Sequence, residues 1–150
     1  RHANHELHID IPEQIEMHSY PGPYGQVLIN LLQNAMLHGF DGIAHGQMRI
    51  TANLLANQLN HERVQIRFED NGKGIPEEHI GRIFEPFFTT KLGHGGSGLG
   101  LNVTYNIVTS LLGGQIKVDS VVGHGTVFTL ELPLRASDVE ESKAMASESA

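Results

Sequence analysis

The sequence predicts an α/β fold: a two-layer sandwich in which about three helices cover one face of a mixed sheet of about five strands. Segments in which apolar and polar residues alternate are interleaved with segments whose apolar residues recur with a helical period. Most alternating segments come in pairs separated by turn residues, which is typical of hairpins. Apolar residues make up 39% of the 150 residues, enough for a sizeable core. We therefore expect one domain over residues 1–135.

In the first half of the chain, strand and helix patterns alternate. Residues 7–11 alternate apolar with polar side chains and predict a short strand. Apolar residues then follow a helical period from about residue 24 to residue 38, where glycines end the pattern. Residues 47–69 predict a hairpin that places Asp70 at the end of its second strand.

The second half contains two helices and a second hairpin. Pro76 followed by two glutamates predicts the start of a short helix. Residues 98–112 predict a longer helix, and residues 116–132 a second hairpin with a glycine turn. The expected apolar stripe of the longer helix consists of Leu99, Val103, Ile107, Val108 and Leu111. Residues 136–150 are small, polar and acidic, and we expect a disordered tail or linker there.

Composition excludes several classes of function. The chain has no cysteine, so it has neither a disulfide framework nor a thiolate metal site. Its net charge of −7 argues against nucleic acid as a partner. The ten histidines are scattered, and none forms a metal-binding pair on a clear helix. Without an apolar run that could span a bilayer, we expect a cytoplasmic piece with no direct membrane contact, although a membrane-bound parent protein is compatible.

An asparagine stripe marks the first helix. Asn30, Asn34 and His38 recur every four residues and drift only slowly around one face. An unpaired buried amide costs about 1–3 kcal/mol, so a ligand is a natural partner for such a stripe. An asparagine oxygen also suits Mg²⁺, which commonly takes only one or two protein ligands. The alternative is a solvated stripe on the helix surface.

A second motif runs from Asp70 to Ile75. Asp70 offers a carboxylate acceptor, which suits an exocyclic amine such as that of adenine. Gly72 and Gly74 carry no side chain, which lets a ligand lie against the backbone. Tight turns use the same residue types, so this motif alone is weak. Lys73 is expected to be solvated.

An aromatic block and a glycine-rich segment follow. Phe84, Phe87 and Phe88 surround Glu85-Pro86, and they predict either a hydrophobic plug or the anchor of a mobile lid. Residues 95–101 contain four glycines and lead into the longer helix, whose N-terminal N–H groups favour an anion. A phosphate loop of the Walker type is excluded because its G-K-[ST] ending is absent.

In this order, the four motifs resemble the N, G1, F and G2 boxes of the catalytic domain of two-component sensor histidine kinases, over roughly residues 5–133. The resemblance implies the Bergerat fold of the GHKL ATPases, with ATP and Mg²⁺ as cofactors. It makes Asn34 the metal ligand and Asp70 the adenine-reading residue, which favours ATP over GTP because a carboxylate would repel the carbonyl of guanine. Lys91, which follows the aromatic block, is the best local candidate for a cation near the phosphates. A basic residue that many family members carry is replaced here by Leu37.

By the same resemblance, one set of residues is expected to contact ATP, and Asn34 and Lys91 are the best catalytic candidates within it. The set is Asn30, Asn34, His38, Asp70, Gly72, Gly74, Ile75, Phe84, Thr89, Thr90, Lys91, Gly96, Ser97, Gly98, Leu99, Gly100 and Thr126.

The resemblance implies a bacterial signal-transduction kinase that passes the γ-phosphate of ATP to a histidine on a separate dimerisation domain, and through it to a response regulator. His5-Glu6 superficially resembles the acceptor motif but lies in a predicted strand, so we expect a fragment that lacks its own acceptor and is monomeric. Three alternatives stay open: an ATPase of the gyrase, chaperone or MutL kind, a serine kinase of the anti-sigma type, and a degenerate ATP-binding module. Asn30 counts against the first, because those relatives carry a glutamate there.

Overall fold

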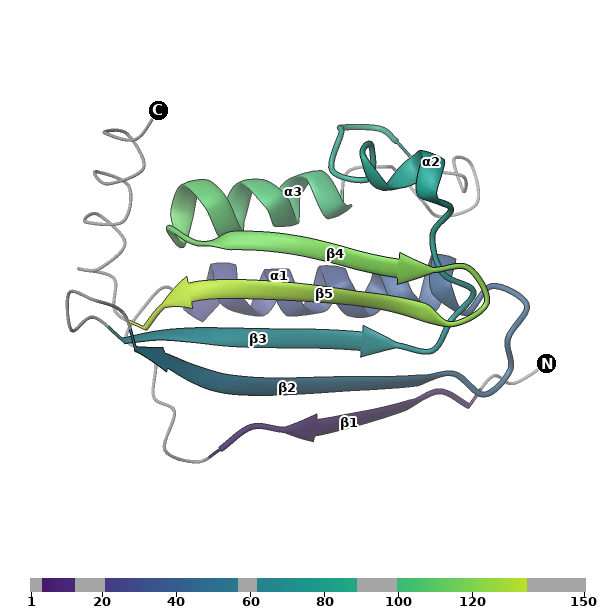
Figure 1. Cartoon of the computed structure of the whole chain (residues 1–150), viewed down its shortest axis with the longest axis horizontal. Helices are drawn as coiled ribbons and strands as arrows, with labels where there is room; N and C mark the ends of the chain where they lie inside the picture. The colour runs from purple at the N-terminus through teal and green to yellow at the C-terminus, as the bar shows by residue number, and fades with distance from the viewer. Residues whose placement is uncertain (1–3, 13–20, 57–61, 89–99, 135–150) are drawn as a thin grey trace.

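A computed structural model describes residues 4–12, 21–56, 62–88 and 100–134. Its five-stranded sheet has the strand order β1-β2-β3-β5-β4 (Figure 1). The outermost strand β1 pairs with β2 in parallel, and the other neighbours are antiparallel. The strands are β1 (Glu6–Asp10), β2 (Gln47–Ala56), β3 (Glu62–Asp70), β4 (Gln115–Val121) and β5 (Gly125–Pro133).

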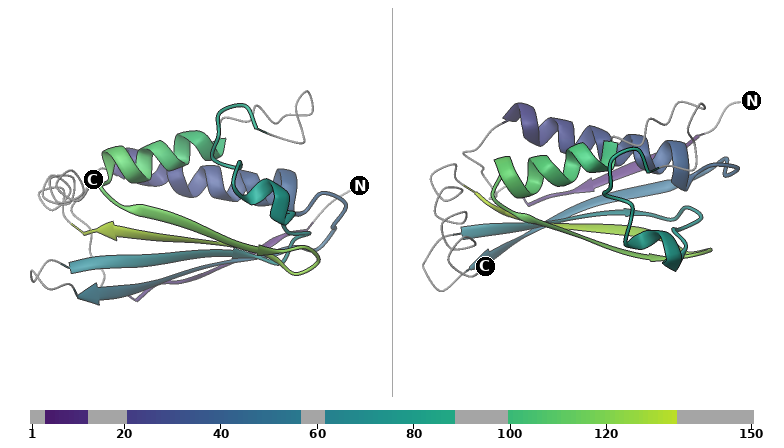
Figure 2. Two further views of the ribbon diagram at one scale, coloured as in Figure 1. Left: turned by 45° about the horizontal axis from the view of Figure 1, so that its top comes forward. Right: turned by 90° about the horizontal axis from the view of Figure 1, so that it is seen from above.

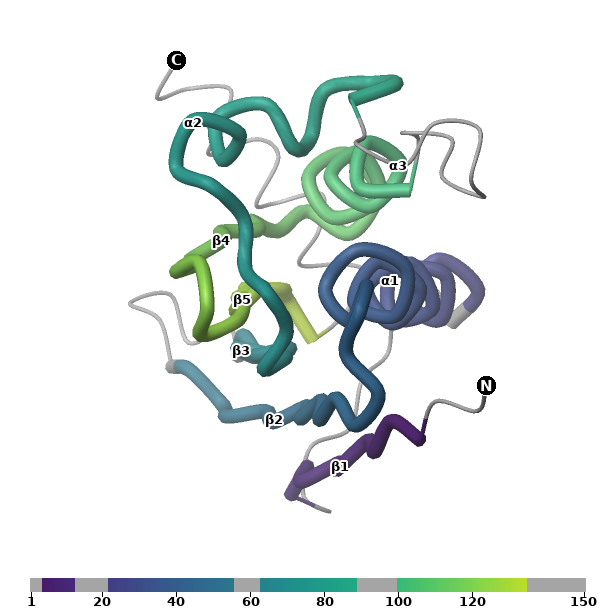
Figure 3. Tube along the Cα trace, turned by 90° about the vertical axis from the view of Figure 1, so that its right-hand side faces the viewer, coloured from purple at the N-terminus to yellow at the C-terminus, as the bar shows by residue number. Residues whose placement is uncertain are grey.

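The helices cover one face of this sheet (Figure 2). Two of them continue into a π-helical turn, named η1 and η2. Viewed along the strands, α1 and α3 lie side by side over the sheet, and α2 lies near β4 (Figure 3). The predicted two-layer α/β sandwich is thus confirmed. The helical elements are α1 (Pro21–Asn34), η1 (Ala35–Gly39), α2 (Glu77–Ile80), α3 (Gly100–Asn106) and η2 (Ile107–Leu111).

The core lies between the helix layer and the sheet. Val27, Leu31 and Ala35 form the buried face of the first helix, as its period predicts. They face a sheet surface that includes the fully buried Phe68 and Phe128. Burial of each large apolar side chain contributes about 1.5–3 kcal/mol to folding. The hairpins β2–β3 and β4–β5 therefore lie on a continuous apolar layer that fixes their register.

The predicted apolar stripe of the longer helix is confirmed at Val108, which is buried, and at Ile107, which packs on the core, but it is wrong at Val103 and Leu111, and Leu99 lies outside the described residues. Val103 and Leu111 are 39% and 40% exposed, whereas Thr104, Val108 and Leu112 are buried. The π-helical turn adds one residue to the last turn, with the Leu112 N–H donating to the Ile107 carbonyl, so Leu112 reaches the core in place of Leu111. Thr104 tolerates burial because its hydroxyl donates to the Gly100 carbonyl at 2.9 Å.

Strand β1 confirms the predicted N-terminal strand, but it forms an exposed edge of the sheet. Leu7 and Ile9 pair with Met48 and Ile50 and stay largely exposed, whereas those partners are buried. The proposed tail at residues 136–150 lies outside the described residues.

Candidate functional site

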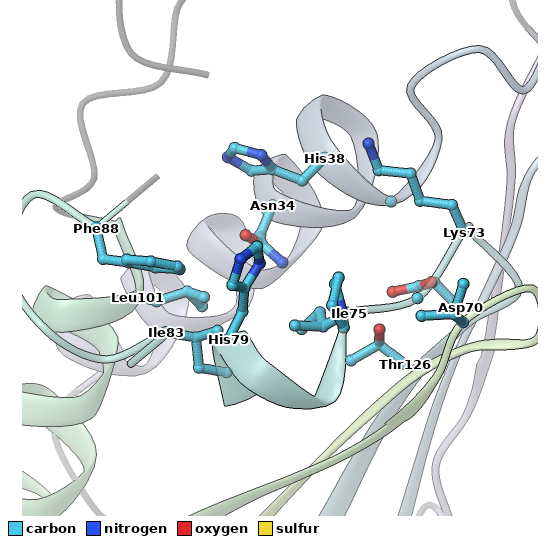
Figure 4. Close-up of a pocket in the computed structure, with 14 residues that line it drawn as sticks. Asn34, His38, Asp70, Lys73, Ile75, His79, Ile83, Phe88, Leu101 and Thr126 are labelled. Carbon is cyan, nitrogen blue, oxygen red and sulfur yellow. The ribbon is translucent and has the colours of Figure 1, made fainter. Parts of the chain in front are cut away.

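A pocket of about 370 Å³ opens where the end of the first helix meets the ends of β3 and β5 (Figure 4). The remaining walls come from the loop after β3, from α2 and from the start of α3. All four sequence motifs thereby contribute residues to one pocket, although they are far apart in the chain. The predicted site residues that line it are Asn34, His38, Asp70, Gly74, Ile75 and Thr126.

The π-helical turn η1 shapes one wall of the pocket. Regular α-helix ends at Asn34, and the Phe40 N–H then donates to the Ala35 carbonyl at 2.8 Å. Asn34 and His38 both line the pocket from this segment (Figure 4). Such wide turns recur at functional sites. Two of the three members of the asparagine stripe, Asn34 and His38, thus lie in the pocket wall.

Asp70 lies at the inner end of the pocket and is only 8% exposed. Its carboxylate accepts the Gly72 N–H at 2.9 Å and also a backbone hydrogen bond from Thr126. Burial raises the pKa of the Asp70 carboxyl, and these two hydrogen bonds lower it in part. The carboxylate keeps further lone pairs, so it can accept a hydrogen bond from a ligand.

The sheet register places Asp70 beside two hydroxyls. Asp70 of β3 pairs with Thr126 of β5, and Thr126 pairs with Ser120 of β4. Directly paired residues point to the same face, so the three polar side chains form a row across three strands. Ser120 does not line the pocket but contacts Thr126, which does, and the sequence analysis missed this supporting residue. The signal was available, because the short turn between β4 and β5 sets this pairing.

The glycines of the loop after β3 prove to have a packing role. A Cβ on Gly72 would lie 2.3 Å from the Gly39 carbonyl oxygen, and one on Gly74 2.4 Å from the Val121 carbonyl oxygen. Gly74 also has φ +79°, which favours glycine. Their predicted role was to let a ligand approach the backbone. That role stays a prediction, and the loop is in addition held between η1 and the β4–β5 hairpin, with Gly74 lining the pocket.

The aromatic block divides into three parts. Phe84 contacts Tyr105 in a tilted arrangement with a centroid separation of 5.2 Å, and it packs on the core as a plug. Phe88 lines the pocket under the Arg82 guanidinium, 4.7 Å from its ring centroid. Phe87 is 68% exposed with φ +66°. The sequence predicted the plug without separating these roles.

Several predicted contacts lie elsewhere. Asn30 is buried, and its amide accepts from Gln26 at 2.7 Å and donates to the Gly100 carbonyl at 3.3 Å, so it joins α1 to α3. Asn30, Gly72, Phe84 and Gly100 are not among the described residues that line the pocket. The predicted contacts Thr89, Thr90, Lys91, Gly96, Ser97, Gly98 and Leu99 lie outside the described residues.

Eight other residues line the pocket without having been predicted to contact a ligand. Lys73 was expected to be solvated, yet it lines the pocket and pairs with Asp41 at 3.5 Å. Ile83, Phe88 and Leu101 lie at the end of the pocket opposite Asp70 (Figure 4). These eight residues are scattered along the sequence and share no helical or strand period, so the sequence patterns did not identify them as a group. The set is Gly39, Lys73, Pro76, His79, Ile83, Phe88, Leu101 and Val122.

The donor set fits a metal held together with a ligand. Within the described ranges, no group of three or more His, Cys, Asp or Glu side chains could hold a metal ion alone. Asn34 offers one oxygen in the pocket wall, which suits a hard cation whose remaining ligands are phosphate and water oxygens. Across the same ranges, no helix combines the length and apolar character needed to cross a membrane.

Known proteins resemble this chain in sequence and in fold. A family described as histidine kinase-, DNA gyrase B- and HSP90-like ATPases matches residues 21–136. Sporulation kinase E of Bacillus subtilis is 36% identical over 92% of this chain and 18% of its own length. Sensor histidine kinase ZraS of Salmonella typhimurium is 43% identical over 77% of this chain and 23% of its own length. This chain thus spans about a fifth of such relatives.

A solved structure supports the same likeness. The catalytic domain of histidine kinase ThkA superimposes with a TM-score of 0.72 at 30% identity, covering 89% of this chain and 81% of that one. The mycobacterial sensor histidine kinase MprB shares the fold, with a TM-score of 0.66 at 23% identity.

Proposed function

This chain belongs to the family of histidine kinase-, DNA gyrase B- and HSP90-like ATPases, and from this premise we propose that its pocket binds Mg·ATP for transfer of the γ-phosphate to a histidine on a separate domain. The relatives are sensor histidine kinases, which makes this the catalytic ATPase domain of such a kinase. We infer that the acceptor domain belongs to the same parent protein and that a response regulator receives the phosphoryl group next. We also infer that the domain works in the cytoplasm.

The observation that carries the proposal is the buried Asp70 carboxylate, which lines the pocket directly beside Thr126. Burial raises the pKa of Asp70, and no neighbouring cation contributes to the shift. The hydrogen bonds that its carboxylate accepts come from the backbone N–H groups of Gly72 and Thr126. A neutral amino group is therefore a better partner for it than a carbonyl. The exocyclic amine of adenine supplies such a group, and guanine has a carbonyl at the same position.

Asn34 lies in the pocket wall and would hold the metal. Bound Mg²⁺ neutralises charge on the phosphate oxygens of its nucleotide. In this chain, Asn34 would orient those phosphates and His38 would contact the nucleotide nearby. Lys91 is proposed as the cation near the phosphates on the strength of the family resemblance.

Hydrolysis is disfavoured by Asn30. In the related ATPases this position carries a glutamate, whereas the Asn30 carboxamide cannot accept a proton at neutral pH. Its oxygen accepts a hydrogen bond from Gln26, and its nitrogen donates to Gly100. Asn30 thus supports the packing of two helices, and we propose a kinase that turns over ATP only when an acceptor is present.

The decisive experiment is calorimetric titration of the chain with a non-hydrolysable ATP analogue, with and without Mg²⁺, and with the GTP analogue. We expect saturable, Mg²⁺-dependent binding that prefers adenine. A folded Asp70→Ala variant should lose this binding, and normal affinity in that variant would overturn the adenine assignment. If the folded wild type binds neither nucleotide, a degenerate module becomes the better description. Addition of a phosphoacceptor domain and labelled ATP then tests transfer directly.

A further inference from the structure

We propose that Ser120 is a positioning residue for recognition of an amino group on the bound base. It accepts a hydrogen bond from the Thr126 hydroxyl and thereby holds the proton of that hydroxyl away from the pocket. The inference deepens the proposed function and rests on it. Ser120 belongs to β4 and does not itself line the pocket, whereas Thr126 does.

The geometry places three partners around the Ser120 hydroxyl. The Ile75 N–H donates to Ser120 Oγ at 2.7 Å. The same oxygen lies 2.9 Å from the Gly125 carbonyl oxygen and 2.8 Å from Thr126 Oγ1. Ile75 and Thr126 both line the pocket, so this hydroxyl links two walls of the site.

A count of protons decides the direction of each hydrogen bond. A serine hydroxyl has one proton and two lone pairs. The Gly125 carbonyl can only accept, so the Ser120 proton points to Gly125. The remaining contact then requires that Thr126 donate its own proton to Ser120. One lone pair of Ser120 accepts from Ile75 and the other from Thr126, which completes its capacity.

This arrangement leaves Thr126 with lone pairs only for a ligand. The neighbouring Asp70 carboxylate is also an acceptor, and the two residues are directly paired across β3 and β5. Two adjacent acceptors favour an amino group, which has two N–H donors. A carbonyl at the same position would meet only lone pairs. Through Thr126, Ser120 therefore favours a base with an amino group over a base with a carbonyl at the same position.

The test compares ADP with inosine diphosphate, in the presence of Mg²⁺, by calorimetry on the whole 150-residue chain. The two bases differ only at positions 1 and 6, where inosine has an N–H and a carbonyl. In Ser120→Ala the Thr126 proton is released and can donate to that carbonyl. We expect the preference for ADP to fall about three- to tenfold, the value of one hydrogen bond. Ser120→Thr keeps the hydroxyl and should keep the wild-type preference.

A double-variant cycle separates positioning from simple loss of stability. In a Thr126→Val background no hydroxyl proton is present, so adding Ser120→Ala should leave the ratio of the two affinities unchanged. If Ser120→Ala leaves the ratio of the two affinities unchanged, whether or not both affinities fall, the inference is overturned while the proposed function stays intact. Failure of the folded wild type to bind either nucleotide would overturn both. Should Ser120→Ala not fold, Ser120→Cys replaces it, because a thiol accepts hydrogen bonds weakly.

Discussion

At the scale of single residues, the site is defined by the hydrogen-bonding capacity that its buried polar groups keep for a ligand. Asp70 accepts two backbone hydrogen bonds and retains lone pairs toward the pocket. Asn30 has both ends of its amide engaged within the protein. The two residues are similarly buried, yet only Asp70 lines the pocket. Residue type alone therefore could not separate a ligand-binding polar group from a structural one.

The raised pKa of Asp70 predicts a pH dependence of stability. A carboxyl whose pKa is higher in the folded than in the unfolded chain binds its proton more tightly when folded. This group therefore favours folding most below its unfolded pKa, near 4, and its contribution falls as the pH rises through the higher folded value. Urea unfolding at pH 4–7 measures the free energy of unfolding. We expect the decrease that Asp70 causes with rising pH to be absent in Asp70→Asn. Identical slopes for the two proteins would contradict it.

At the scale of elements, glycine loops and π-helical turns decide how the motifs meet. Gly72 packs directly on the backbone of Gly39, and the Lys73 N–H donates to the Gly39 carbonyl at 2.8 Å. The loop after β3 and the turn η1 are thus held together by backbone contacts. Side-chain patterns along the sequence cannot reveal such contacts, because they join residues far apart in the chain.

Gly72→Ala is expected to destabilise the protein by about 1–3 kcal/mol, since its Cβ would lie 2.3 Å from the Gly39 carbonyl oxygen. Gly81→Ala is the matched control, because nothing lies within 4 Å of its Cβ and its φ is −70°. Chemical denaturation of both variants measures the difference. Equal stability of the two variants would mean that the loop does not pack on η1 as described.

The π-helical turn η2 makes a prediction about two neighbouring leucines. Leu112→Ala should cost about 2–5 kcal/mol of unfolding free energy, because Leu112 is 1% exposed in the core. Leu111→Ala should cost under about 1 kcal/mol, because Leu111 is 40% exposed. Thermal or urea unfolding of this pair tests the register. A larger loss for Leu111→Ala would restore the stripe predicted from an uninterrupted α-helical period.

At the scale of the whole molecule, one surface suits a partner domain. Phe87 is 68% exposed, and Tyr105 on α3, which contacts Phe84, is also exposed. The Phe84–Tyr105 ring contact and the hydrogen bond from the Asn102 side chain to the Phe84 carbonyl hold the segment that carries Phe87 against α3. Exposed aromatic residues on a fixed support are typical of interaction surfaces. We therefore expect the phosphoacceptor domain to contact this part of the protein.

Phe87→Ser should leave nucleotide affinity within about twofold, because Phe87 is not among the described residues that line the pocket. It should slow transfer to a separately supplied phosphoacceptor domain about tenfold or more, as expected when an exposed interface aromatic is lost. Radiolabel transfer at several acceptor concentrations measures this. Ile9→Ser controls for loss of apolar surface, because Ile9 lies on the edge strand β1, is 63% exposed and is not among the described residues that line the pocket. Unchanged transfer in Phe87→Ser would exclude this contact.

The sequence by itself determined the order of helices and strands, the two hairpins and the polar residues Asn34 and Asp70. It could do so because local periodicity and turn chemistry act over a few residues. Only the tertiary structure decided that Asn30 packs between helices, that Leu112 replaces Leu111 in the core, and that Ser120 joins Ile75 to Thr126. These outcomes depend on sheet register and on π-helical turns, which follow from packing across the whole domain.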